Sequence, residues 1–128
     1  MTNPTLNYDE ERGKQYSYRG TLTSNGELAG TCCVRLSPLY HYINGNHVWL
    51  TIDDLFVFPK FQGNGCERLM IEKMLEFAKR NQLGILKNHR SNHPTEYSSK
   101  LIKLLLEMGF KKHDDKYLYH TFDGGQVQ

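Results

Sequence analysis

Two pairs of residues could carry chemistry in this chain: two closely spaced glycines and two adjacent aspartates. Gly63 and Gly65 lie in the stretch VFPKFQGNGCERLM, residues 57–70, where an apolar run gives way to a charged one. We expect a strand to end and a helix to begin here, and the first N–H groups of a helix have no partner within it. A turn without side chains in front of such amides can bind an anion. The carboxylates of Asp53 and Asp54 interrupt an otherwise apolar strand and need a separate explanation.

The periodicity of apolar residues indicates the elements that must position these groups. Alternating or β-branched runs predict strands, with the Asn-Gly dipeptide at 25–26 as a hairpin turn, and apolar residues at helical spacing predict two amphipathic helices. We expect strands at 14–24, 28–36, 48–58, 84–88, 110–112 and 115–122, helices at 67–80 and 96–108, and a connecting loop at 37–47. Residues 1–13 are polar and form an N-terminal arm, either loose or a short edge element. The chain therefore reads as one α+β domain over residues 14–122, an α/β sandwich, with a tail at 123–128.

Composition argues against several classes of protein. The 128 residues carry a formal net charge of +2 and no run of Lys and Arg, so a nucleic-acid partner is not expected. The three cysteines show no disulfide framework, which favours a reducing, cytoplasmic setting. No apolar run is long enough to cross a membrane, so no membrane partner is expected. The six histidines show no metal-ligand spacing, and no metal is expected.

The run IDDLFVFPKFQGNGCERLMIEKMLEFAKR, followed by LLLEMGF, resembles the GCN5-related N-acetyltransferase (GNAT) superfamily. That family's signature is a strand, a Gln or Arg, two spacers, Gly, one spacer, and Gly or Ala at the start of a helix. Residues 62–66 match it in place, Glu67 stands where the second small residue belongs, and Gly109-Phe110 matches the family's closing pair. The resemblance implies a mixed, mostly antiparallel sheet with a splayed strand and packed helices, in a short form whose N-terminal acceptor-site helices are reduced or absent. The alternative is a tight glycine turn in an unrelated α/β domain.

The resemblance further implies acetyl-CoA as the acyl donor. Backbone amides of the glycine turn would hold its pyrophosphate, and the splayed strand would hold its pantetheine arm. The implied contacts are Phe56, Val57 and Phe58 on the strand, and Gln62, Gly63, Asn64, Gly65, Cys66, Glu67 and Arg68 at the turn. Glu67 departs from the pattern because a carboxylate competes with a bound anion for the positive end of the helix. We expect its side chain to point away from the pyrophosphate.

The acceptor implied by the resemblance is an amine. A lysine-like amine titrates near ~10.4 and must lose a proton before it attacks the thioester. A carboxylate can hold the ammonium and take that proton, and Asp53-Asp54 is similar to the acidic pair of the diamine and polyamine branch. Because successive strand residues point to opposite faces, we choose Asp53 as the group that faces the amine. The alternative is a charge pair without a catalytic role.

One element of the family is missing, because Leu105 stands where a tyrosine usually protonates the departing thiolate. A thiol titrates near ~8.5, so the thiolate can leave without an acid. Tyr97, Tyr117 and Tyr119 are possible substitutes, although aromatic residues at such spacings more often belong to a core. We expect the N–H of Val57 to stabilise the thioester oxygen as it gains charge.

The expected function is transfer of an acetyl group to an amine by direct attack on the thioester. The alternative, motivated by Glu67 and Leu105, is a GNAT-like module that binds acyl-CoA or a protein without catalysis. Few residues precede Lys14 to roof an acceptor site. A protein or peptide amine is therefore favoured over a small polyamine-like molecule, and a homodimer could complete the site.

Overall fold

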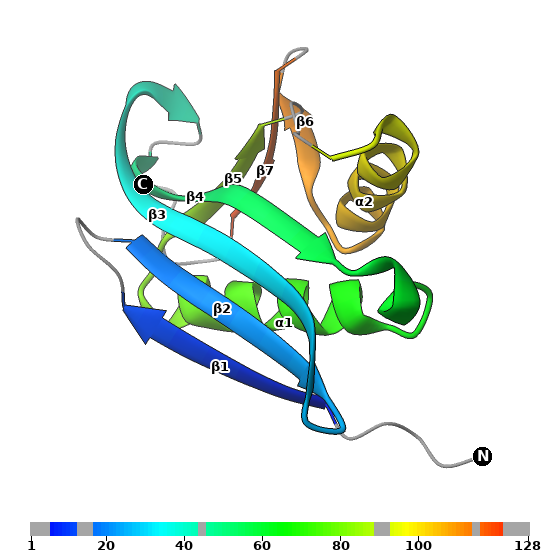
Figure 1. The fold of residues 1–128 in the computed structure, drawn as a ribbon. Helices are drawn as coiled ribbons and strands as arrows, with labels where there is room; N and C mark the ends of the chain where they lie inside the picture. Colours follow the sequence, from blue (N-terminus) through cyan, green and yellow to red (C-terminus); the bar gives the residue numbers. More distant parts are fainter. Residues whose placement is uncertain (1–5, 13–16, 44–45, 89–92, 114–115, 122–128) are drawn as a thin grey trace.

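The computed structural model describes residues 6–12, 17–43, 46–88, 93–113 and 116–121; for 6–8, 10–12, 37–43 and 46–48 it describes the backbone alone. In chain order the elements are β1 (Leu6–Arg12), β2 (Ser17–Ser24), β3 (Glu27–Ile43), β4 (Asn46–Val57), a 3-10 turn η1 (Pro59–Phe61), α1 (Cys66–Arg80), β5 (Gly84–Asn88), α2 (Thr95–Glu107), β6 (Lys111–His113) and β7 (Tyr117–His120) (Figure 1).

The strands form one seven-stranded sheet in the order β1-β2-β3-β4-β5-β7-β6. Every neighbouring pair is antiparallel except β4 and β5, which run parallel. A parallel pair needs a long crossover, and α1 supplies it. The predicted α+β class and the mixed, mostly antiparallel sheet are confirmed. The hairpin at 25–26 is confirmed as well, since Asn25 and Gly26 both have the positive φ values, 52° and 83°, that such a turn requires.

The segment at 37–47 was predicted as a loop, and that prediction is wrong. β3 runs to Ile43 and β4 starts at Asn46, with Ile43 paired to Asn46, so most of the segment extends the β3–β4 hairpin. Pro38 and Gly45 had pointed to a loop, but β-forming Tyr and Ile residues occupy much of the stretch. At the N-terminus, residues 6–12 form the edge strand β1 paired with β2, which agrees with the second of the two forms considered for that segment.

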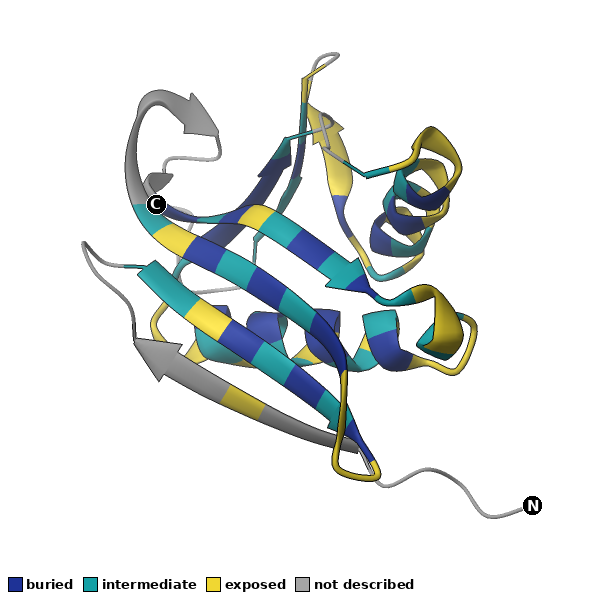
Figure 2. Ribbon diagram, viewed as in Figure 1, coloured by how far each residue is buried: buried dark blue, intermediate teal, exposed yellow. Residues whose placement is uncertain are grey.

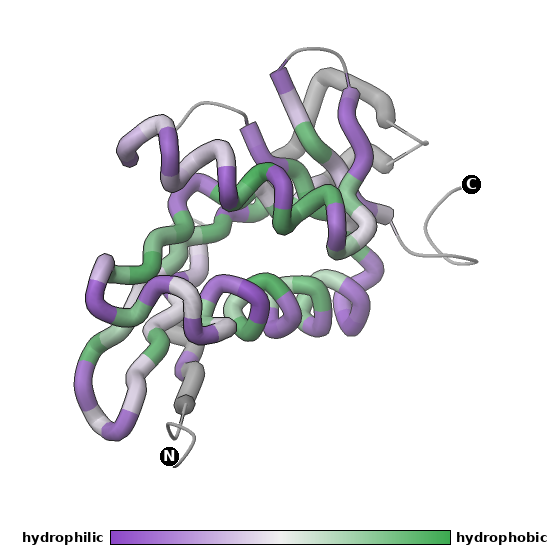
Figure 3. The backbone as a smooth tube through the Cα atoms, turned by 90° about the vertical axis from the view of Figure 1, so that its right-hand side faces the viewer, coloured by the Kyte–Doolittle hydropathy of each residue, from purple (hydrophilic) through white to green (hydrophobic). Residues whose placement is uncertain are grey.

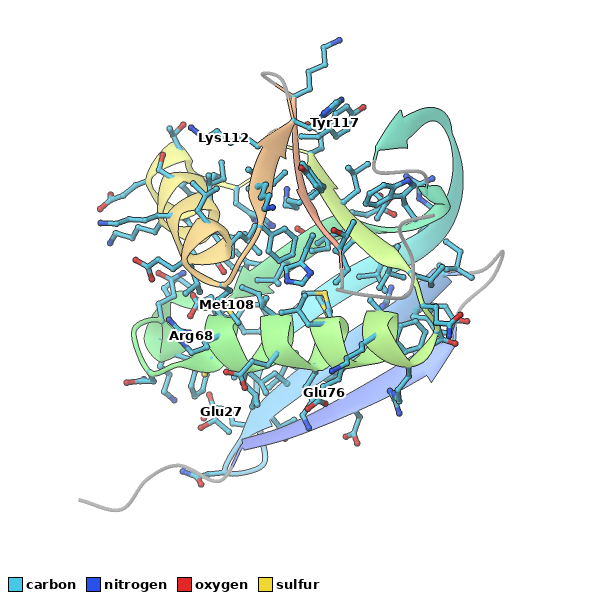
Figure 4. The ribbon with its side chains drawn as sticks, turned by 180° about the vertical axis from the view of Figure 1, so that it is seen from behind. Glu27, Arg68, Glu76, Met108, Lys112 and Tyr117 are labelled. Atoms are coloured by element: carbon cyan, nitrogen blue, oxygen red, sulfur yellow. The ribbon has the colours of Figure 1, made fainter. Side chains whose placement is uncertain are left out.

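The two helices and the sheet share one core. The buried positions of α1 include Met70, Ile71 and Met74, those of α2 are Tyr97, Leu101 and Leu105, and all join a cluster with sheet residues such as Leu50, Ile85 and Leu118. In Figure 4, α1 crosses in front of β1 to β3 and α2 stands beside β6. Buried positions alternate with less buried ones along β2 and along residues 30–36 of β3 (Figure 2), and hydrophobic and hydrophilic segments alternate along α1 (Figure 3). No helix in the described ranges is long and apolar enough to span a membrane.

Strand β3 lies close against β4 at Gly30. A Cβ atom at this position would lie 2.7 Å from the backbone oxygen of Phe56 and 3.2 Å from the Cα atom of Val57. Glycine is therefore required where β3 supports the last residues of β4. This close approach fixes the part of β4 that forms the candidate site.

Candidate active site

The end of β4 separates from β5. The parallel pairing runs from Trp49 opposite Gly84 to Ile52 opposite Lys87, whereas β4 stays paired with β3 as far as Val57. Beyond residue 52, one edge of β4 is therefore open toward β5. The predicted splay is present, and α2 with the turn before α1 lies beside the end of β4 (Figure 1).

Val57 directs its polar backbone groups into this opening. Its N–H donates to the hydroxyl of Tyr97 at 3.0 Å, and its carbonyl accepts from the side-chain amide of Gln62 at 2.8 Å. The N–H of Phe58 instead donates to the carbonyl of Ala29 on β3. Because strand residues alternate in the direction of their hydrogen-bonding groups, Val57 offers its backbone to the opening and Phe58 does not.

The glycine turn that follows is open. Gly63 and Gly65 have φ values of 84° and 81°, and a Cβ atom on either would meet nothing within 4 Å. Gly65 is the N-cap of α1 and gives it no side-chain hydrogen bond. In the described part of the chain, the backbone N–H groups of residues 63–68 have no protein acceptor. Unpaired amides at the positive end of a fifteen-residue helix suit a phosphate group.

The acidic pair lies on a β-bulge. β4 has one residue more than β3 at Asp53, between the pair of Ile52 with Val34 and the pair of Asp54 with Cys33. The β4 residues buried in the core shared with the helices are 50 and 52 before the bulge but 55 and 57 after it. Both aspartates therefore lie on the side away from these buried positions. The expectation that they point to opposite faces is wrong, because the bulge breaks the alternation.

The two carboxylates have different partners. Asp53 accepts from Nε of Arg35 at 2.9 Å and from its terminal nitrogen at 3.0 Å, and this contact raises the pKa of the arginine. Both side chains of this pair are about half exposed. Asp54 instead contacts Nε2 of His93 at 2.6 Å. Asp53 is thus engaged by an arginine on β3, while Asp54 faces the segment that leads into α2.

Three aromatic rings close the opening between β4 and α2. The His93 ring stacks on Phe56, with centroids 4.2 Å apart and planes 15° from parallel. Tyr97 packs against both, with ring centroids 4.9 Å from Phe56 and 6.1 Å from His93. The pKa of Tyr97 is raised, first by burial and further by the charge of Glu67 and a hydrogen bond to it. The Tyr97 hydroxyl, which accepts from the Val57 N–H, thus stays protonated.

The model of the acetyltransferase (GNAT) family matches residues 2–110. The chain belongs to this family. A comparison with curated protein sequences finds no significant match. Solved structures with the same fold include a predicted acetyltransferase from Clostridium acetobutylicum with acetyl-CoA, at a TM-score of 0.60 and 17% identity over 78% of this chain and 61% of that one. The chain thus spans less than two thirds of that relative.

Two further structures with this fold are complexes with different kinds of partner. Arabidopsis thaliana Naa50, in complex with the bisubstrate analogue CoA-Ac-MVNAL, has a TM-score of 0.63 and 16% identity over 84% of this chain and 74% of its own. The KacTA–DNA complex has a TM-score of 0.65 and 17% identity over 85% of this chain and 70% of that one. At such identities these structures show that the GNAT fold is shared.

Glu67, which departs from the GNAT pattern, acts electrostatically on the splay. Its charge helps to raise the pKa of Tyr97 on α2. Arg68 pairs with Glu107 at 3.8 Å, and Lys60 pairs with Glu27 at 3.0 Å. These two cations are therefore engaged by carboxylates beside the turn. Figure 4 shows Arg68 at the end of α1 nearest α2.

Cys66 is a buried residue of the core. Burial, followed by the charge of Glu67, raises the pKa of its thiol. This disfavours the thiolate and agrees with the packing role expected for it. No metal-binding cluster of His, Cys, Asp and Glu occurs among the described residues.

Sequence reasoning missed His93. Pro94 follows it directly and serves as the N-cap of α2, so the turn before the helix places the imidazole against β4. A histidine before a proline at a helix start was a visible signal, but nothing in the sequence indicated contact with Asp54. The structure also separates the three tyrosines. Tyr97 reaches the splay, whereas Tyr117 and Tyr119 pack against Trp49 and Leu86.

Proposed function

We propose that this GNAT protein is an acetyl-CoA-dependent N-acetyltransferase that acts on an amine. Two sets of backbone donors support the proposal most directly: the Val57 N–H at the splay and the unpaired amides of residues 63–68 at the glycine turn. A phosphate can bind the second set while a thioester carbonyl reaches the first. The residues present therefore fit acetyl-CoA, through Val57 on the strand and residues 62–68 at the turn.

Tyr97 would act twice during transfer. Its hydroxyl occupies the Val57 N–H until the thioester oxygen takes its place and is stabilised there. The displaced hydroxyl would then be available to the sulfur. Because its pKa is raised, it is protonated and can donate to the thiolate as the C–S bond breaks. This arrangement supplies an acid that Leu105, which is buried in the core, cannot.

The acceptor we favour is an amine of a protein or peptide. The carboxylates of Asp53 and Asp54 are partly exposed, at 40% and 45%, and a cationic group can reach them from solvent. The complex of Naa50 with CoA-Ac-MVNAL shows that a related fold accepts a peptide-like group. A second copy of the chain would extend the acceptor side. The three cysteines are free thiols, which supports action in the reducing cytoplasm.

The experiment is thiol release from acetyl-CoA with a lysine peptide, an N-terminal peptide and a polyamine, together with calorimetry of acetyl-CoA binding. Gly65→Val should weaken binding at least tenfold, because its side chain would stand where the phosphate approaches. Gly26→Val is the matched control: its φ is 83°, its surroundings are equally open, and it lies in the distant β2–β3 hairpin. Equal loss of binding in the two variants, or no thiol release with any acceptor, would contradict the proposal.

A further inference from the structure

His93 and Asp54 form a pair that the expected site did not include. Nε2 of the imidazole lies 2.6 Å from Oδ1 of Asp54, within the range of a charge-assisted hydrogen bond. The ring is fixed on its face by Phe56, and its side chain is 22% exposed. An imidazole that is oriented by a carboxylate and still open to solvent can exchange protons.

We propose that His93, oriented by Asp54, accepts the proton that the acceptor amine loses. This inference rests on the proposed acetyltransferase function and names the group that performs one of its steps. It also changes the role of the acidic pair. Asp54 positions the base, and Asp53, which accepts two hydrogen bonds from Arg35, does not act as the base.

The position of His93 suits this role. The thioester oxygen would take the Val57 N–H, which the Tyr97 hydroxyl now occupies at 3.0 Å. The centroid of the His93 ring lies 6.1 Å from the centroid of the Tyr97 ring. An attacking nitrogen must lie about 3 Å from the thioester carbon and within hydrogen-bond reach of its base, directly or through one water. An amine bound beside both rings can meet both conditions.

The ammonium gives one proton to His93, which becomes an imidazolium ion opposite the Asp54 carboxylate. The nitrogen lone pair forms the C–N bond, and the C–S pair leaves with the sulfur. The second proton from nitrogen goes to solvent, the sulfur takes a proton from Tyr97, and imidazolium and phenolate then return to their starting forms by exchange with water. The net products are the amide, the thiol of CoA and one proton.

Other charged groups face this pair from each neighbouring element. Lys87 on β5 feels the charges of Asp54 and Asp53, although burial lowers its pKa. On the other side, Glu67 of α1 interacts with Tyr97 of α2. Their charges set the pH at which activity rises, so the test compares variants with the wild type and does not depend on an absolute midpoint.

The test measures initial rates against pH at saturating acetyl-CoA with the best acceptor. His93→Gln should lower kcat by about 10²- to 10⁴-fold, the range of a positioned base, and should remove the acidic limb of the pH profile. The KM for acetyl-CoA should change less than threefold. Added imidazole should raise the rate of His93→Ala at least tenfold above its rate without imidazole. Asp54→Asn should lower kcat and move the acidic limb to lower pH without removing it, because an amide cannot stabilise the imidazolium ion. His113→Gln, at an exposed position on β6, should leave the rate unchanged.

Three outcomes overturn the assignment. If His93→Gln keeps a rate within threefold of the wild type, or if imidazole gives no rescue in a His93→Ala variant that still binds acetyl-CoA, His93 is not the base. If the wild type transfers no acetyl group at all, the proposed function fails, and this assignment fails with it. The wild-type rate therefore distinguishes the two failures.

Discussion

Replacing Tyr97 with Phe removes one oxygen atom from the centre of the site. The ring keeps its contacts with Phe56 and His93, so packing is preserved. The Val57 N–H, which donates to the hydroxyl at 3.0 Å, loses its partner in a buried environment. Leaving a buried donor unsatisfied costs about 1–3 kcal/mol. For a chain of this size, each kcal/mol lowers the thermal midpoint by about 3–5 °C.

The same substitution separates binding from chemistry. The thioester oxygen no longer has to displace a hydroxyl from the Val57 N–H, so affinity for acetyl-CoA should be unchanged or higher. The rise in thermal midpoint on adding acetyl-CoA should therefore be at least as large in Tyr97→Phe as in the wild type. Turnover should fall by about tenfold to a hundredfold, near the lower end for a positioned acid, because a thiolate leaves readily.

The pH dependence of stability gives an independent check. The pKa of Tyr97 is raised by burial, so above pH ~10 the tyrosine of the unfolded chain ionises while Tyr97 in the folded chain stays protonated. The wild type therefore loses stability as pH rises through this window, and Tyr97→Phe lacks this contribution. The gap in thermal midpoint between the two proteins should narrow from pH 8 to pH 11. Scanning calorimetry with and without acetyl-CoA, combined with initial rates, measures all three quantities. Weaker acetyl-CoA binding together with undiminished turnover would refute the reasoning.

Two further substitutions test the fold around the site. Gly30→Ala should destabilise the protein by about 1–3 kcal/mol, the range for overpacking, because its Cβ atom would lie 2.7 Å from the backbone oxygen of Phe56. An unchanged urea midpoint would show that β3 does not constrain the end of β4. Lys87→Met should raise the thermal midpoint at pH 7, since burial lowers the pKa of Lys87 and keeping its charge there costs stability. That gain should shrink as pH approaches ~10.5. The control Lys111→Met, at an exposed position, should change the thermal midpoint little. A lower midpoint for Lys87→Met would show that the attraction of the Lys87 ammonium to Asp54 and Asp53 outweighs the cost of its burial.

Most of the fold could be predicted because local patterns decide it. The Asn-Gly turn at 25–26, the amphipathic spacing in α1 and α2, and the β-branched run before residue 57 each specify one kind of element. The extension of β3 to Ile43 and of β4 back to Asn46 could not be predicted. A long hairpin depends on pairing between its two strands, which a local pattern does not show. From the local pattern alone, Pro38 and Gly45 indicated a loop.

The candidate site could be predicted only in part, and for a physical reason. The glycine turn and the Val57 backbone are properties of adjacent residues, so the sequence contains them. The bulge at Asp53 depends on the pairing of β4 with β3. It breaks the alternation of side-chain faces from which Asp53 was predicted to face the amine. The contacts of Tyr97 with Val57 and of His93 with Asp54 join residues 40 and 39 positions apart. Such pairs arise from tertiary packing and leave no local pattern.

The most direct test of the central claim is mass spectrometry of an acceptor incubated with the protein and isotope-labelled acetyl-CoA. The account predicts that a peptide amine gains one labelled acetyl group and that one CoA thiol is released for each group transferred. Wild type should label the peptide, Gly26→Val should do so at a comparable rate, and Gly65→Val should do so much more slowly. A protein that binds acetyl-CoA but labels neither peptide amines nor a polyamine would contradict the claim that this site transfers acetyl groups.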